Sequence, residues 1–252
     1  MAADPAFGAY LDSALAADAK GPLVIEVRDA AGALVRRYAS DDKVVAPDLA
    51  HIDTAPEWIP VHEPPLATAG GHRLVWDLHY ATPEGLDRDP RLGGVWAPPG
   101  DYSVTLTVDG VSFRKPLKVV PDPRVKASPA SYDEAFALAR AIEADRIRGR
   151  DGLAALAAAG KALPSTRADL AGRAAALADA ADPDSLMGVM LRLGDLQLAV
   201  DGADGAPSAD AKAGFVLANA ALARALAAVA ALRAEPADIA RTGAPSGGAS
   251  SS

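Results

Sequence analysis

The chain has 252 residues, a formal net charge of −8 and a pI near 5.0, so it lacks the excess of Lys and Arg that attracts nucleic acid or anionic lipid. It contains no cysteine, which excludes disulfides, thiolate metal sites and a cysteine nucleophile. The length is enough for two domains of modest size. We therefore expect no nucleic-acid partner and a two-domain organisation.

The first 20 residues form an N-terminal segment that does not resemble a signal peptide. Asp4, Asp12 and Asp18 interrupt it, and it lacks both a basic start and a continuous apolar stretch. The later apolar runs are rich in alanine and are broken by charged residues. We expect a soluble chain without a membrane span, and these features leave its cellular location open.

Residues 21–122 have the pattern of an antiparallel β-sandwich. Two short strands are predicted at 23–27 and 34–38, because Asp and Gly between them supply the chemistry of a tight turn. Residues 40–71 show no periodicity and are rich in Pro, Asp and Ala. They predict a long ordered loop that carries Trp58.

The strongest strand signals lie at 74–80 and 102–108, where apolar and polar residues alternate. Trp76 shares the apolar face of the first of these strands and is therefore predicted to lie in the core. Asp109-Gly110 then turns the chain into a last strand at 111–120. Pro116 lacks a backbone N–H, so this strand is predicted to lie at a sheet edge or a bulge.

After residue 122 the composition shifts to Ala, Leu, Arg and Asp, and residues 128–238 predict an antiparallel four-helix bundle. Ser131 and Glu134 have the spacing of a capping box at the start of the first helix. Prolines and serines mark the later starts, which gives helices at 131–150, 165–180, 184–200 and 208–234. The Gly/Ser-rich tail, 239–252, is predicted to be disordered.

The polar residues do not form a recognisable reaction centre. The four histidines lie in the β region but have no metal-ligand spacing, which favours surface positions for His51, His62, His72 and His79. The carboxylates occur in turn contexts: Asp41 with Asp42, and Glu84 with Asp87 and Asp89. Asp201 to Gly205 lacks the remaining ligands of a calcium loop and predicts a turn between helices. We expect no catalytic residue, no metal and no cofactor.

Aromatic side chains provide the one candidate ligand site. Trp58 and Trp96 lie in proline-stiffened segments and are candidates for stacking on a sugar ring, with core packing as the alternative for both.

Several segments match, in order, a family of bacterial proteins. They include GAYLDSAL near the N-terminus, GPLVIEVRDAAGALVRRYAS, APEW, HRLVWDLHY, APPGDYSVTLTVDG, PLKVVPDPRV, SYDEAFALAR and LQLAVDGADGAPSADA. From about Gly8 to Ile239 the chain resembles the C-terminal region of sortilin-like, BNR-repeat β-propeller proteins that are often labelled glycosyl hydrolases.

This resemblance implies a fold and a role. It implies that the sandwich is Ig-like or FlgD-like, so that the expected fold is α+β and multidomain: an N-terminal Ig-like antiparallel β-sandwich followed by a C-terminal antiparallel four-helix bundle. The family's propeller is absent from this sequence, and any hydrolytic site would be expected there. The resemblance thus implies a non-catalytic accessory module that packs on a β-propeller, as a fragment or a separately encoded part of an exported, periplasmic or secreted protein. A carbohydrate-binding module, or part of a glycan-acting hydrolase, is the alternative.

Overall fold

The computed structural model describes residues 7–44, 63–86, 94–163 and 165–242, with side chains as far as residue 235. These residues form antiparallel sheets and helices, so the predicted α+β class is confirmed. The chain divides into two units, Met1–Arg140 with Val200–Pro207, and Ala141–Ala199 with Ser208–Ser252. Each unit is described separately.

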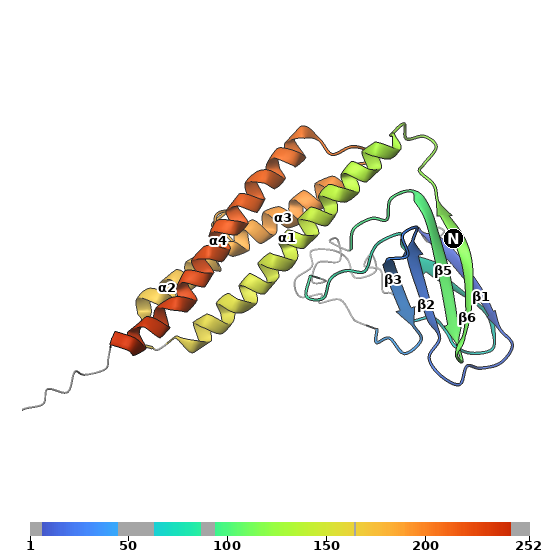
Figure 1. Cartoon of the computed structure of the whole chain (residues 1–252), viewed down its shortest axis with the longest axis horizontal. Helices are drawn as coiled ribbons and strands as arrows, with labels where there is room; N and C mark the ends of the chain where they lie inside the picture. Colours follow the sequence, from blue (N-terminus) through green and yellow to red (C-terminus); the bar gives the residue numbers. More distant parts are fainter. Residues whose placement is uncertain (1–6, 45–62, 87–93, 164, 243–252) are drawn as a thin grey trace, which may run out of the picture. The chain divides into compact units, whose positions relative to one another are not determined.

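Among the described residues of the first unit, six strands form two antiparallel sheets (Figure 1). The strands are β1 (Ala9–Leu15), β2 (Val24–Asp29), β3 (Leu34–Ala39), β4 (Gly70–Trp76), β5 (Gly100–Val108) and β6 (Val111–Val119). One sheet has the order β1-β4 and the other β3-β2-β5-β6. β6 is an edge strand, as Pro116 indicated. β1 was not predicted, because its small residues (AYLDSAL) give only a weak β signal.

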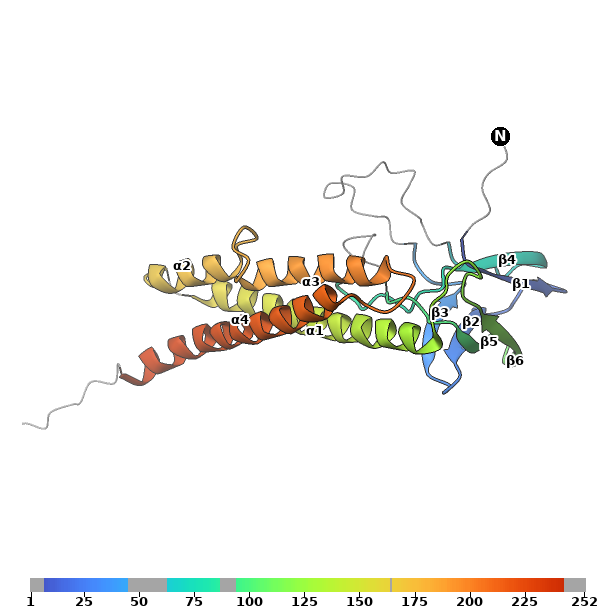
Figure 2. The same ribbon diagram turned by 90° about the horizontal axis from the view of Figure 1, so that it is seen from above.

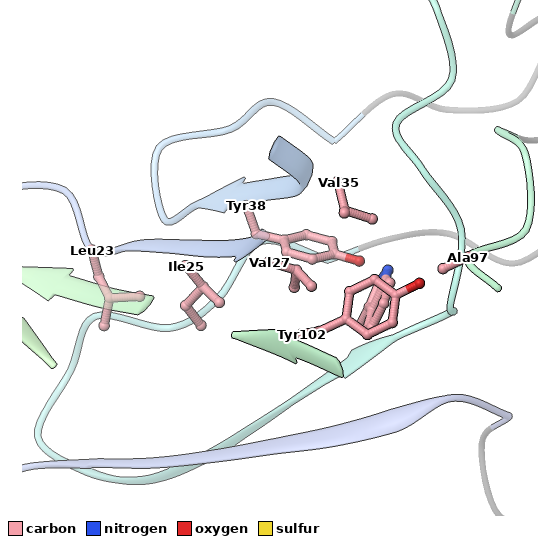
Figure 3. Close-up of a cluster of buried hydrophobic side chains, with 8 residues drawn as sticks. Leu23, Ile25, Val27, Val35, Tyr38, Ala97 and Tyr102 are labelled. Atoms are coloured by element: carbon pink, nitrogen blue, oxygen red, sulfur yellow. The ribbon is translucent and has the colours of Figure 1, made fainter. Parts of the chain in front are cut away.

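Both sheets contribute to one hydrophobic core, whose buried members gather between the strands in Figure 3. They are Leu23, Ile25, Val27, Val35, Tyr38, Trp76, Ala97 and Tyr102. Trp76 is fully buried and contacts Tyr102 in an edge-to-face geometry, with ring centroids 5.5 Å apart. The predicted core position of Trp76 is therefore confirmed.

β4 ends at Trp76, so the predicted strand 74–80 is too long. The indole Nε1 of Trp76 donates a hydrogen bond to the carbonyl oxygen of His79 at 2.9 Å. This bond requires the chain to turn back after β4, and Leu78 has a left-handed backbone with φ of 61°. A bulky residue rarely adopts that conformation, and its cost of about 1–3 kcal/mol must be offset by the surrounding packing.

The helices are α1 (Pro129–Ala162), α2 (Ala168–Leu177), α3 (Leu186–Asp201) and α4 (Ala209–Thr242), as seen in Figure 2. The predicted start of the first helix is shifted, because the Oγ of Ser128 accepts the backbone N–H of Ser131 at 3.2 Å and Pro129 occupies the first helical position. The predicted start at Ser208 agrees with α4, where the Oγ of Ser208 accepts the N–H of Ala211 at 3.0 Å. The predicted cap at Ser165 is wrong, because α2 begins at Ala168 and has no side-chain cap.

α1 continues well past the predicted end at residue 150. Gly149 lies inside it at a close approach to α3, where an added Cβ would lie 2.0 Å from the Sδ of Met190. Gly149 therefore serves helix packing inside α1.

Buried polar pairs connect three helices of the second unit. Arg146 on α1 donates a hydrogen bond to the amide oxygen of Gln197 on α3, and both side chains are buried. Asn219 on α4 donates to the carboxylate of Asp145, which is also buried, at 2.6 Å. Because a slip of one helix would leave these groups without their partners in a dry interior, the pairs favour one register.

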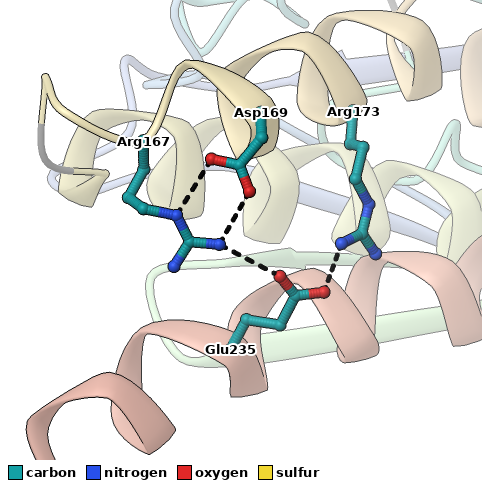
Figure 4. Close-up of polar contacts among 4 residues, drawn as sticks. All are labelled: Arg167, Asp169, Arg173 and Glu235. Carbon is teal, nitrogen blue, oxygen red and sulfur yellow. Dashed lines mark hydrogen bonds and ion pairs between the residues drawn. The ribbon is translucent and has the colours of Figure 1, made fainter.

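An ion cluster connects α2 with the C-terminal part of α4 (Figure 4). Arg167 binds Asp169 at 2.9 Å and Glu235 at 3.4 Å, and Arg173 also pairs with Glu235. The hydrogen bond from Arg167 lowers the pKa of Asp169 to about 2. Since these groups are largely solvated, the cluster orients α2 more than it stabilises the unit.

One described stretch, Ala209–Glu235 of α4, is long and apolar enough to cross a membrane, and a third of its apolar 18-residue window is buried. The buried positions recur at helical spacing, as in a core helix: Ala218, Ala221, Leu222, Ala225, Val229 and Leu232. Core helices of soluble proteins meet the same criterion, so the expected absence of a membrane span stays a prediction.

The phenol of Tyr102 provides a test of the β core. Its hydroxyl donates a hydrogen bond to the carbonyl oxygen of Pro98 at 2.6 Å. We expect Tyr102→Phe to destabilise the first unit by about 1 kcal/mol, which accelerates amide hydrogen exchange in β2 and β5 about fivefold. Tyr10→Phe, in β1 and outside the buried core cluster, is the control and should leave exchange in β2 and β5 unchanged. Equal exchange in both variants would contradict a role for the Tyr102 hydroxyl.

Candidate functional site

The first unit contains a groove with a volume of about 830 Å³. All of its lining residues belong to that unit. Most of the wall is apolar and aromatic, and it includes Phe7, Leu78, Trp96, Val120, Tyr132 and Phe136. This volume and lining are typical of sites for small molecules or extended chains.

Trp96 is held on the groove wall by its own backbone and by two rings. Its backbone forms an antiparallel bridge with His79, and the neighbouring Ala97 donates its N–H to the oxygen of Leu78 at 2.8 Å. The indole ring lies 3.9 Å from the ring of His79 and 5.6 Å from that of Phe7, measured between centroids. These two rings occupy much of the indole surface and leave Trp96 half-buried.

A glycine permits the close chain packing behind Trp96. A Cβ at Gly94 would lie 1.9 Å from the carbonyl oxygen of Tyr80, which is backbone and cannot move aside easily. The adjacent Tyr80 N–H donates to the oxygen of Val95 at 2.8 Å. Any larger residue at position 94 would therefore displace the segment that carries Trp96.

The second wall of the groove comes from the start of α1, which belongs to the first unit. The ring of Phe136 lies 5.4 Å from that of Tyr80, and the guanidinium of Arg140 lies 5.2 Å from the same tyrosine ring. Burial raises the pKa of Tyr80. These aromatic and cation–π contacts fix Phe136 where it faces the groove.

The rim of the groove is charged. Arg124 donates from Nε to Asp122 Oδ1 at 3.0 Å, and its backbone N–H donates to the same oxygen at 2.8 Å. Asp201 and Asp204 also line the groove. A ligand would thus meet an apolar floor with hydrogen-bonding groups at its edge, and no covalent chemistry follows from this set of residues.

Only one of the two tryptophans predicted to bind a ligand can be located in the structure. Trp96 lies on the groove wall, whereas Trp58 lies outside the described residues. The sequence did not identify Phe7, Leu78 or Phe136 as residues of the same groove as Trp96. Leu78 faces the groove only because its backbone is left-handed, and the sequence carries no signal for that conformation.

Two of the four histidines can be placed. The ring of His72 contacts the carbonyl oxygen of Thr68 at 2.7 Å, and that of His79 contacts the oxygen of Asp77 at 2.8 Å. His51 and His62 lie outside the described residues. Within the described ranges, no three His, Cys, Asp or Glu side chains are grouped so as to hold a metal ion.

The candidate carboxylates occupy turns where they can be seen. Asp42 accepts the N–H of Ala39 at 2.6 Å, and the segment from Asp201 to Gly205 connects α3 to α4, as predicted. Asp87 and Asp89 lie outside the described residues.

Comparison with known proteins adds no relative: no family model, curated protein or solved structure matches the chain. The site must therefore be interpreted from its geometry.

The ion pair between Asp122 and Arg124 allows a prediction about the pKa of Asp122. The hydrogen bonds from Arg124, first from its side chain and then from its backbone, lower the pKa of Asp122 from 3.8 to about 2. The pair thus stabilises the folded rim fully above pH 3.8, and this contribution is lost as pH falls through about 2. We expect Arg124→Ala to raise the Asp122 pKa part of the way towards 3.8, because the backbone bond remains, as measured by carboxyl NMR titration. An unchanged pKa would show that the side chain has no role.

Proposed function

We propose that this chain is a non-catalytic accessory module, an Ig-like sandwich followed by an antiparallel four-helix bundle, that packs on a β-propeller domain or subunit. The observation that carries the proposal is apolar exposure on the edge strand β6. Val111 is 53% exposed and Phe113 is 58% exposed, side by side on one face of the sheet. Contiguous apolar patches larger than a few hundred Å² are rare on monomeric domains, so exposed apolar side chains that lie side by side are candidates for contact with a partner.

Features of the first unit support the sandwich part of this proposal. One core draws on both sheets, and the Tyr102 hydroxyl bonds back to the carbonyl of Pro98, four residues upstream. A tyrosine that bonds to its own upstream backbone at a strand start is similar to the tyrosine corner of Ig-like domains.

Buried apolar residues on the helices support the four-helix bundle part of the proposal. α1, α3 and α4 each carry buried apolar residues, among them Ile142, Leu193 and Leu222. The ordered sequence motifs supply the third line of support, because in the family that they resemble such a module accompanies a propeller.

A binding experiment tests this function. We expect the purified chain to form an equimolar complex with the β-propeller protein or domain encoded nearest to it, as measured by sedimentation velocity. Helical and β-rich proteins of similar size and charge are the controls and should not bind. Absence of a complex at about 100 µM of each protein would overturn the proposal, since even a weak functional interface is occupied at that concentration.

A carbohydrate-binding module, alone or as part of a glycan-acting hydrolase with its active site on the propeller, is the second candidate. The position of Trp96 on the wall of the groove favours it, because indole rings stack on sugar rings and the rim offers Asp122 and Arg124 as hydrogen-bonding groups. The contacts of Trp96 with Phe7 and His79 reduce the ring area left for a ligand.

A glycan array tests the second candidate. If the groove binds a sugar, Trp96→Ala should weaken binding at least about tenfold, whereas Trp96→Phe should retain part of it because a ring remains. Tyr10→Ala, at an exposed ring outside the groove, is the matched control. If no glycan binds the wild-type chain, or if Trp96→Ala binds as wild type does, the groove is not a sugar site.

A further inference from the structure

The four-stranded sheet is covered unevenly by the two-stranded sheet. Tyr38, Ile25, Leu106 and Phe113 lie opposite one another in one row that crosses β3, β2, β5 and β6. Along this row Tyr38 is 6% exposed and Ile25 is 3% exposed, Leu106 is half-buried, and Phe113 is 58% exposed. Burial therefore ends at β6.

The position of β4 explains this gradient. A cavity of about 490 Å³ is lined by Ile25 and Tyr38 together with five consecutive residues of β4, Gly71 to Val75, but with only Ser13 of β1, so β4 lies closer to β2 and β3 than β1 does. Its partner β1 therefore lies on the side of β5 and β6, as Figure 1 shows. Just beyond β1, the N–H of Lys20 binds Asp109 in the β5–β6 turn at 2.9 Å. The two-stranded sheet ends at β1 and leaves the first part of β6, Val111 to Lys115, uncovered, whereas Leu117 and Val119 further along β6 are half-buried against the core.

The free edges of β6 and β1, which lie on this side of the first unit, differ in whether they can pair with a further strand. β6 carries Pro116, which has no N–H, and Lys115 and Lys118, which oppose edge pairing. β1 has no proline, and within the described residues it pairs only with β4. Every second residue of β1 therefore presents its N–H and C=O to the free edge, next to the uncovered face of β6.

We infer that an extended segment of a partner protein adds to the free edge of β1 as a third strand and covers Val111 and Phe113. This inference deepens the proposed function, and it rests on it in taking the occupant to be a partner protein. Main-chain hydrogen bonds to β1 supply affinity, and alternate apolar side chains of the segment pack on β6.

Charge specifies the occupant further. Lys115 is exposed on the same face of β6 as Phe113, and among the described residues it has no ionic partner. Arg114, in contrast, donates to Ser103 at 2.9 Å, and Lys118 lies 3.9 Å from Asp101. The added strand should therefore carry a carboxylate where it passes Lys115, within an alternating apolar and polar sequence.

A designed peptide tests the inference with the full chain. The probe is a fluorescein-labelled peptide of ten residues that alternates valine and threonine around one central glutamate, and binding is read as fluorescence anisotropy. We expect saturable binding that falls at least about tenfold when two threonines are replaced by proline, because the ladder N–H groups are lost. Phe113→Ser should cause a similar loss. Leu34→Ser, which alters a side chain 46% exposed at the opposite sheet edge, should have no effect.

Charge reversal provides a second readout that does not depend on stability. Lys115→Glu should make the chain prefer a peptide with lysine in place of the central glutamate. Absence of saturable binding, or equal binding of the proline peptide, would overturn strand addition. A concentration-dependent dimer that Phe113→Ser abolishes would also overturn it, since the occupant would be a second copy of the chain.

The two proposals fail separately. If the propeller binds but Phe113→Ser leaves that complex unchanged, strand addition at β1 is wrong and the accessory function stands. If the peptides bind as expected but no propeller does, the accessory function is wrong and the surface serves another protein.

Discussion

The hydrogen bond from the Trp76 indole to the carbonyl oxygen of His79 connects the core of the first unit to its groove. A large ring fully inside the core needs an acceptor for its N–H, and the chain after β4 turns back to supply one. That turn places Leu78 on the groove wall and brings His79 against Trp96. The buried bond therefore helps to position Leu78 and His79, and the backbone bridge between His79 and Trp96 holds the tryptophan beside them.

The groove and the uncovered face of β6 lie at opposite ends of the β5–β6 hairpin. Gly100 pairs with Val119 near the groove, and Val108 pairs with Val111 at the far end. Nine residues of strand separate them, which is about 25 to 30 Å. A ligand in the groove would therefore not reach Val111 and Phe113. Phe7, however, lines the groove two residues before β1, so a strand that pairs with the start of β1 would lie beside a ligand in the groove.

The sequence predicted the strands and helices that follow from local residue patterns. It did not predict the features that depend on contacts between residues far apart in the chain. Alternation and turn residues identified β2, β3, β5 and β6, and Pro116 identified the edge. β1 was not predicted as a strand because its pairing with β4 is long-range and its residues are small. The end of α1 was predicted too early, since the helix continues to Ala162 and contains Gly149 at a close approach to α3. In the site, Trp96 could be proposed from the sequence because tryptophan is a common ligand-stacking residue. Leu78 and Phe136 could not, because a left-handed turn and the start of α1 place them in the groove.

Every tryptophan of the chain lies before residue 100, and Trp76 is at the centre of the β core. The helices contain none, yet α1 and α4 alone account for most of the helical residues. Intrinsic fluorescence therefore reports on the first unit, while far-ultraviolet circular dichroism is dominated by the second. A single melting experiment followed by both signals would reveal whether the two units unfold together or one after the other.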